Sequence, residues 1–205
     1  MKIAIIDYGM GNLRSVEKAF HKVGMDGAFV TDDPAAVANA DKAVLPGDGT
    51  FDQTMRSLRR SGTDRIALEF IASGRPFLGI CVGMQVLLTG SEEGEPGVEG
   101  LNVVPGRVRR FPATAGLKVP QIGWNTLEFA ANSPLGDDVP GDAPMAYFLN
   151  SYYCVTGDPA DIAATTDYGF PFCSALHRGN VWATQFHPEK SGPVGLAILR
   201  NFARL

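Results

Sequence analysis

The sequence predicts an α/β protein with a central, mostly parallel β-sheet flanked by helices and additional antiparallel strands in its second half. In the first half, short apolar runs alternate with stretches of helical periodicity, as in parallel strands joined by helical crossovers. From about residue 103 to 186, strand-like runs and turn clusters replace that pattern. No linker or internal repeat divides the 205 residues, so we expect one domain spanning residues 1–205.

The elements are expected in the following order. Buried strands of the first half are predicted at residues 2–7, 27–31, 42–45 and 76–80. Helices of the first half are predicted at residues 13–23, 51–60, 64–73 and 82–88. Strands of the second half include residues 145–149 and 181–186. A last helix at about residues 193–205 is indicated by Val194, Ile198 and Phe202, which recur at four-residue spacing.

Composition and charge narrow the classes of function. The chain is 45% hydrophobic and 20% charged, with a net charge of −4 and no basic block, so neither nucleic acid nor an anionic membrane surface is expected as a partner. No apolar run is long enough to span a bilayer, and Asp7 ends the first one far short of a secretory signal. Cys81, Cys154 and Cys173 fall into no metal-ligand or disulfide spacing. We therefore expect a cytoplasmic protein with no metal and no cofactor.

The segment Gly79-Ile80-Cys81-Val82-Gly83 lies where a predicted strand turns into a predicted helix. Glycines two residues on either side of a nucleophile are typical of a sharp elbow, where a Cβ would crowd the turn. A thiol there lies at a helix N-terminus, which favours the thiolate, and the amide of Val82 points toward a developing oxyanion. The alternative is a buried structural cysteine, which Cys154 and Cys173 fit because they lie in apolar strands without flanking glycines.

Of the three histidines, His187 is the candidate base. It follows a predicted strand, and Pro188 biases it toward an extended conformation. Residues two apart in an extended segment project to the same side, so Glu189 can bind one imidazole nitrogen and leave the other for the cysteine. The alternative is a strand-end histidine beside a surface carboxylate. His21, on a polar stretch of helix, and His177, in a turn cluster, are expected at the surface.

Several segments resemble a known family. Residues 79–85 and 185–191 resemble the nucleophile and histidine motifs of the class I, or triad, glutamine amidotransferases, whose domain is flavodoxin-like. Other segments are similar to one branch of that family, the glutaminase subunits of imidazole glycerol phosphate synthase from histidine biosynthesis. These segments are residues 7–15, 45–49, 120–125 and 147–153.

The resemblance implies a two-protein reaction. Cys81 attacks the carboxamide of glutamine, with His187 and Glu189 completing the triad, and water hydrolyses the glutamyl thioester. The ammonia passes to a separate (β/α)₈ cyclase subunit in a heterodimer, which converts PRFAR to imidazole glycerol phosphate and AICAR. The resemblance also implies glutamine binding by Gln85, Glu93 and the backbone of Ser151 and Tyr152, an oxyanion hole from Val82 and Gly49, and a partner interface at Asn12, Trp124, Tyr147 and Lys190. Without it, Trp124 and Tyr147 would be interpreted as core aromatics and Lys190 as an ordinary surface charge.

Two positions depart from the pattern of the family. Asp48 occupies a loop position that is commonly apolar in relatives, and Asn150 one where many relatives carry histidine. Two alternatives are open for Asp48. Its carboxylate accepts hydrogen bonds from nearby backbone amides and holds one conformer of the oxyanion loop, or it points to solvent without effect.

Three other interpretations are weighed against this one. Gly9-Met10-Gly11 after the first strand, with Asp32 about twenty residues on, is typical of a dinucleotide-binding turn, but Arg14 stands where the third glycine belongs. A free-standing hydrolase or cysteine peptidase would use the same elbow and would work without a partner. Another amidotransferase branch, of the anthranilate, aminodeoxychorismate or GMP synthase type, would change the ammonia acceptor and keep the triad.

Overall fold

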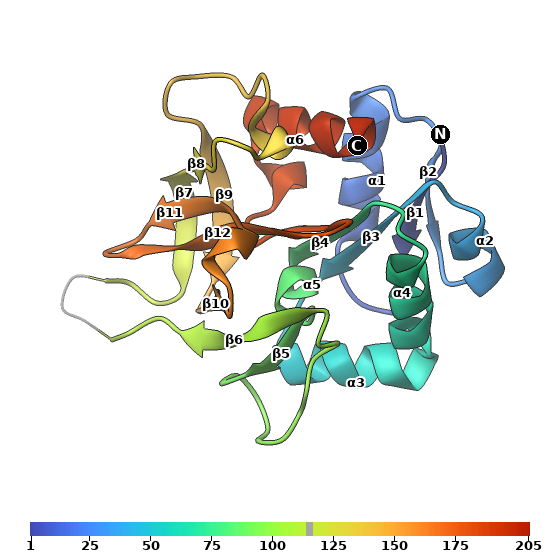
Figure 1. The fold of residues 1–205 in the computed structure, drawn as a ribbon, viewed down its shortest axis with the longest axis horizontal. Coiled ribbons are helices and arrows are strands. Elements are labelled where there is room, and N and C mark those ends of the chain that lie inside the picture. Colours follow the sequence, from blue (N-terminus) through green and yellow to red (C-terminus); the bar gives the residue numbers. More distant parts are fainter. Residues whose placement is uncertain (114–116) are drawn as a thin grey trace.

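The computed structural model describes residues 1–113 and 117–205 and shows a large β-sheet with helices on both faces (Figure 1). The main path of the sheet has the strand order β2-β1-β3-β4-β13-β12-β10-β6-β5. Strand β11 pairs with β12 and with β8, while β7 and β9 form a separate two-stranded sheet. The predicted α/β class, with parallel strands from the first half and antiparallel strands from the second, is confirmed.

The centre of the sheet is parallel. Its strands are β1 (Ile3–Ile6), β2 (Ala28–Thr31), β3 (Lys42–Gly47), β4 (Phe77–Cys81) and β13 (Val181–Thr184). Four of them, β1, β3, β4 and β13, are buried along their whole length, which is why they occur as continuous apolar runs. Strand β13 comes from the second half of the chain, yet it pairs with β4 so that Thr184 lies opposite Ile80. This pairing brings the segment that follows β13 next to the end of β4.

Helices cover both faces of the sheet. They are α1 (Leu13–Lys22), α2 (Pro34–Ala38), α3 (Phe51–Ser61), α4 (Thr63–Ala72), α5 (Val82–Gln85) and α6 (Gly192–Arg204). Helices α1 and α6 lie on one face, and α3 and α4 on the other (Figure 1). The rings of Phe20 and Phe202, with centroids 6.4 Å apart, pack α1 against α6. Among the residues that the structure describes, no helix has the length and apolar character to cross a membrane.

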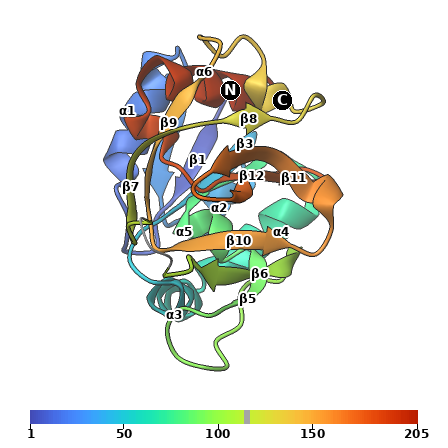
Figure 2. The ribbon, with the colours of Figure 1, turned by 90° about the vertical axis from the view of Figure 1, so that its left-hand side faces the viewer.

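The remaining strands pair mostly in antiparallel fashion, except that β5 and β6 are parallel to each other. They are β5 (Leu88–Ser91), β6 (Val104–Arg110), β7 (Gln121–Thr126), β8 (Glu128–Phe129), β9 (Met145–Asn150), β10 (Tyr152–Thr156), β11 (Ile162–Asp167) and β12 (Pro171–Arg178). Short 3₁₀ turns occur at η1 (Pro134–Gly136), η2 (Pro159–Asp161) and η3 (Pro188–Lys190). Figure 2 shows β7 and β9 running side by side, apart from the strands β10 to β12.

Two elements differ from the sequence prediction. The helix predicted at residues 82–88 ends at Gln85, because Leu88 already pairs with Val104 in the parallel ladder of β5 and β6. Helix α2 was not predicted. Its start carries the usual signals, since Pro34 is its first residue and Asp33 accepts a hydrogen bond from the amide of Ala35 at 2.9 Å.

Candidate active site

Cys81 lies on the strained elbow that the glycine spacing predicts. It ends β4 with φ of 57° and ψ of −114°, a conformation that costs free energy and recurs at functional sites. The packing behind it requires the neighbouring glycines. A Cβ on Gly79 would lie 2.7 Å from the carbonyl oxygen of Gly83, and a Cβ on Gly83 would overlap the carbonyl oxygen of Leu45. The expected crowding of the turn is confirmed.

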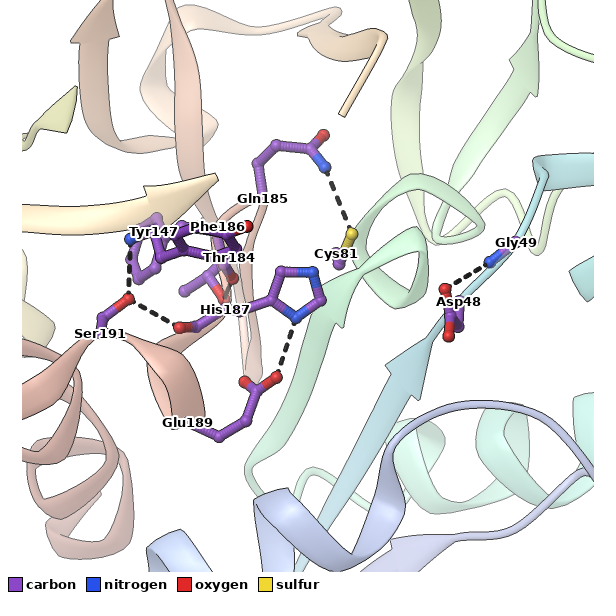
Figure 3. Close-up of polar contacts among 10 residues, drawn as sticks. All are labelled: Asp48, Gly49, Cys81, Tyr147, Thr184, Gln185, Phe186, His187, Glu189 and Ser191. Carbon is purple, nitrogen blue, oxygen red and sulfur yellow. Dashed lines mark hydrogen bonds and ion pairs between the residues drawn. The ribbon is translucent and has the colours of Figure 1, made fainter. Parts of the chain in front are cut away.

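His187 and Glu189 come from the segment after β13, the parallel neighbour of β4. The Nδ1 atom of His187 lies 2.8 Å from Oε1 of Glu189, and the two side chains are 12% and 2% exposed. The other ring nitrogen points toward Cys81 (Figure 3). The structure thus brings the three predicted triad side chains together in the expected order, although the cysteine and the histidine lie in different halves of the chain.

The surroundings of His187 favour its protonated form. Burial by itself lowers the pKa of the imidazole, but the sulfur of Cys81 and the carboxylate of Glu189 outweigh burial and raise the pKa to about 10. A histidine with that pKa is an imidazolium at neutral pH. It lies between the carboxylate of Glu189 and the sulfur of Cys81. The arrangement therefore places a proton donor beside the candidate nucleophile.

The backbone of His187 is held by β9. Its amide donates to the carbonyl of Tyr147 at 3.0 Å. Its carbonyl accepts from the hydroxyl of Ser191 at 2.6 Å (Figure 3). The same hydroxyl accepts from the amide of Tyr147 at 2.9 Å. Sequence reasoning did not single out Ser191, and the available signal was its place four residues after the histidine, just before α6. These three bonds set the position of the base.

A cavity of about 320 Å³ is lined by the triad, which is a volume suited to a small molecule. The other predicted site residues in its lining are Asn12, Gly49, Val82, Gln85, Glu93, Ser151, Tyr152 and Lys190. Trp124 and Tyr147 lie outside this lining, on the adjacent pair β7 and β9. Among residues 1–113 and 117–205, no group of three or more histidine, cysteine, aspartate and glutamate side chains is arranged to hold a metal ion.

Two side chains of the cavity are anchored by the rest of the protein. Oε2 of Glu93 accepts from the amide of Phe51, the first residue of α3, at 2.9 Å, and burial raises the pKa of this carboxyl. Gln85 is 3% exposed and donates through Nε2 to the carbonyl of Tyr152 at 3.3 Å. Both side chains therefore have defined orientations in the cavity.

The other two cysteines and the other two histidines lie outside the candidate triad. Cys154 and Cys173 are buried opposite each other on β10 and β12, and burial raises the pKa of both thiols, that of Cys173 to about 12. The ring of His21 lies 2.9 Å from a carbonyl oxygen of β2, at the surface as expected. His177 corrects the prediction of a surface turn. It is half-buried on β12, and its ring stacks on Trp182 with centroids 3.6 Å apart.

Comparison with known proteins agrees with this geometry. The family model described as glutamine amidotransferase class-I matches residues 4–205. The chain belongs to the class I glutamine amidotransferases. Among its curated relatives are proteins called imidazole glycerol phosphate synthase subunit HisH. That of Syntrophotalea carbinolica is 53% identical over 98% of both chains, and that of Geobacter sulfurreducens is 53% identical over 100% of this chain and 99% of its own.

Solved structures share the fold. A crystal structure of glutamine amidotransferase has a TM-score of 0.73 and 17% identity, with 100% of both chains covered. A putative GMP synthase subunit from Thermoplasma acidophilum has a TM-score of 0.69 and 20% identity, covering 98% of this chain and 92% of its own. The predicted amidotransferase fold and enzyme class are confirmed, and membership of this family goes against a dinucleotide-binding module.

The two departures from the family pattern both line the cavity of this amidotransferase. Oδ1 of Asp48 accepts a hydrogen bond from the amide of Gly49 at 2.8 Å (Figure 3). The amide expected in the oxyanion hole is therefore bound to a carboxylate, as the first alternative for Asp48 requires. Asn150, 7% exposed, donates through Nδ2 to the carbonyl of Tyr152 at 3.0 Å. Its Oδ1 is buried and has no hydrogen-bond partner among the described residues.

An exposed apolar face lies on β7 and β9, beside the cavity of the amidotransferase. Trp124 and Tyr147 are paired across the two strands, with ring centroids 6.1 Å apart. The large exposed side chains of this face are Ile122 (61%), Trp124 (49%), Met145 (42%) and Leu149 (42%). Leu149 also lines the cavity. The interpretation of Trp124 and Tyr147 as core aromatics is wrong, because the first is exposed and the second only half-buried. Contiguous apolar surface of this kind marks interaction sites.

Proposed function

We propose that this chain is the glutaminase subunit of an imidazole glycerol phosphate synthase, and that Cys81, His187 and Glu189 form its catalytic triad. The observation that carries the proposal is the geometry of these side chains. A thiol on a strained elbow faces a largely buried imidazole ring, whose far nitrogen lies 2.8 Å from a carboxylate. The names of the relatives at 53% identity support this synthase over other branches. The family match over residues 4–205 supports a single domain.

The chemistry proceeds in two halves. The Cys81 thiolate attacks the carboxamide carbon of glutamine, and the amides of Val82 and Gly49 stabilise the oxyanion. His187 gives its proton to the amide nitrogen, ammonia leaves, and a glutamyl thioester remains on the sulfur. Water then attacks the thioester while His187 takes a proton from it, and collapse of the intermediate releases glutamate and restores the thiolate. Glu189 keeps the ring oriented and stabilises its charge.

Substrate binding is assigned to groups that share the cavity with the thiol. The side chains of Gln85 and Glu93 and the backbone of Ser151 and Tyr152 line it together with Cys81. Their convergence on one small cavity supports a role in holding glutamine with its carboxamide against the sulfur.

The partner is proposed to be the cyclase subunit of the same synthase, in a heterodimer. The apolar face with Trp124 and Tyr147 supports a docking surface beside the cavity, and Asn12 and Lys190 are exposed residues of the cavity lining. Ammonia released at Cys81 would pass to the cyclase, where PRFAR becomes imidazole glycerol phosphate and AICAR. A cytoplasmic location is part of the proposal, and three free cysteines suit such a reducing compartment.

Cys81→Ala, assayed in the complex, tests the nucleophile. Glutamine-dependent synthesis should disappear, whereas ammonium salts should still support the cyclase reaction. Cys154→Ala and Cys173→Ala are matched controls and should keep glutaminase activity, because burial keeps both thiols protonated. Loss of both activities in a folded complex, or retention of glutamine-dependent synthesis, would count against the assigned role.

Partner dependence is tested with the isolated chain. Its glutaminase activity should be very low and should increase when the cyclase subunit, loaded with its ligand, is added. Trp124→Ser should weaken the association, while Leu68→Ser on α4, a side chain 37% exposed on another part of the surface, should not. Full activity of the isolated chain would contradict this proposal and favour the free-standing hydrolase.

A further inference from the structure

A chain of side-chain amides connects the cavity to the sulfur of Cys81. Gln185 follows β13 and lies level with Cys81, because Thr184 is paired with Ile80. Its side chain is fully buried, and its Nε2 lies 3.9 Å from Sγ of Cys81 (Figure 3). Its Oε1 accepts from Nε2 of Gln85 at 3.1 Å. Gln185 therefore contacts both the candidate nucleophile and a side chain of the cavity.

The direction of these hydrogen bonds is set by a backbone carbonyl at the far end. The carbonyl oxygen of Tyr152 accepts from Nε2 of Gln85 at 3.3 Å and from Nδ2 of Asn150 at 3.0 Å. A carbonyl oxygen can only accept, so Gln85 must present its NH₂ group to it and to Gln185. Gln185 then has its oxygen toward Gln85 and its NH₂ group toward the sulfur. Reversing Gln85 would place its oxygen against two acceptors, and reversing Gln185 would place its NH₂ group against that of Gln85; either mismatch is costly in a buried site.

Two consequences follow from this direction. The sulfur of Cys81 faces an N–H donor, which stabilises a thiolate more than a thiol. The NH₂ group of Gln85 is bound within the protein, so its carbonyl oxygen is the atom that remains for a ligand in the cavity that Gln85 lines. That oxygen is suited to the N–H groups of an amide or ammonium.

We propose that Gln185 is a positioning residue for the glutaminase reaction, which holds the Cys81 sulfur as a thiolate and fixes the carbonyl oxygen of Gln85 toward the substrate. The inference rests on the proposed role of Cys81 as nucleophile. Gln185 and His187, two residues apart just after β13, both direct their side chains toward the sulfur (Figure 3). His187 supplies a charged donor that exchanges protons, whereas Gln185 supplies a neutral donor that does not.

Two variants separate the two tasks of Gln185. Gln185→Met has a similar length and removes both the donor and the acceptor. Gln185→Glu keeps an oxygen for Gln85 and replaces the donor to the sulfur by an acceptor. Ser174→Ala is the matched control, since the carbonyl of Ser174 binds the amide of Gln185 at 2.8 Å while its hydroxyl takes no part in the chain of amides. Circular dichroism and thermal unfolding establish that each variant is folded.

The first measurement is the rate at which iodoacetamide alkylates Cys81 in the full chain, followed by mass spectrometry as the pH is varied. Losing a hydrogen bond to an ionised group should move the midpoint of that rate upward by about one pH unit. We expect this shift in both Gln185 variants and none in Ser174→Ala. The second measurement is steady-state glutaminase activity in the complex with the cyclase. Gln185→Met should raise KM and lower kcat, whereas Gln185→Glu should lower kcat with KM close to that of the wild type.

The outcomes distinguish the inference from the function on which it rests. An unchanged alkylation midpoint in both folded variants would overturn the role of Gln185 at the sulfur. An unchanged KM in Gln185→Met would overturn its role in orienting Gln85. If the proposed function itself were wrong, the wild-type complex would lack glutamine-dependent synthesis, or Cys81→Ala would keep it, whatever the Gln185 variants do.

Discussion

Replacing Asp48 by valine should raise the glutaminase activity of the isolated chain. Oδ1 of Asp48 accepts from the amide of Gly49 at 2.8 Å, so this donor is directed at a carboxylate rather than at a substrate oxygen. The same carboxylate places a negative charge beside the oxyanion hole, which must stabilise the negative charge that develops on the substrate oxygen. Valine removes both effects, and Gly49, with φ of 81°, leaves its backbone free to turn.

The size of the effect follows from the bond that must break. A hydrogen bond within a protein contributes about 0.5–1.5 kcal/mol net, and the exposure of Asp48 and Gly49 places this one in the lower half of that range. A difference of about 0.5–1 kcal/mol is roughly a two- to fivefold change in rate. The upper limit is the cost of one missing oxyanion donor, about 10²–10³ in turnover. We therefore expect kcat of the isolated chain to rise about two- to fivefold, with a smaller rise in the activated complex.

Steady-state glutamate production, measured with and without the cyclase, decides the question. Asp48→Asn keeps an acceptor and removes the charge, so it separates the two effects. Asp167→Val is the matched control, because Asp167 makes a similar contact to the amide of Gly169 at 2.9 Å outside the cavity, and its rate should equal that of the wild type. Equal basal rates for the wild type and Asp48→Val would refute the reasoning.

Two further predictions concern the triad. Glu189→Gln should reduce glutaminase activity less than His187→Ala, and the double variant should be about as poor as His187→Ala alone, because the triad acts as a unit. A far worse double variant would reveal an independent role for Glu189. With its pKa raised to about 10, protonated His187 stabilises the fold fully below about pH 6.5, and this stabilisation is lost as pH rises through about 10. The Tm should therefore fall more steeply between about pH 7 and 10 in the wild type than in His187→Gln, and equal slopes would contradict the protonated ring.

The sequence predicts the elements of the first half well because their signals are local. Continuous apolar runs mark β1, β3 and β4, and their bounds differ from the prediction by one or two residues. The errors arise where tertiary contacts decide. The helix predicted at residues 82–88 is cut short because Leu88 pairs with Val104 of β6, beyond the residues of the predicted helix. Helix α2 has only five residues, too few for helical periodicity to show.

The residues of the candidate site show the same contrast between local signals and tertiary contacts. Cys81 and His187 follow from local patterns, a glycine-flanked elbow and a histidine-proline-glutamate segment. Gln185 and Ser191 were not predicted as site residues, because their contacts depend on the pairing of β13 with β4 and on the approach of β9. The alternation of Gln185 and His187 on either side of buried Phe186 was the signal that could have indicated the glutamine.

The arrangement of the site also indicates where control of the reaction can act. The elbow holds Cys81 in place. His187 is held by Glu189 and by the contacts with β9, and its protonated ring already lies beside the sulfur. A low rate in the free chain would therefore not come from an unassembled triad. Of the two expected oxyanion donors, Val82 begins α5 directly after the nucleophile, whereas the amide of Gly49 is bound to its neighbouring carboxylate. Releasing that one amide would complete the oxyanion hole without moving the triad, so a partner that shifts the Asp48 loop could change turnover while leaving alkylation of Cys81 unaffected.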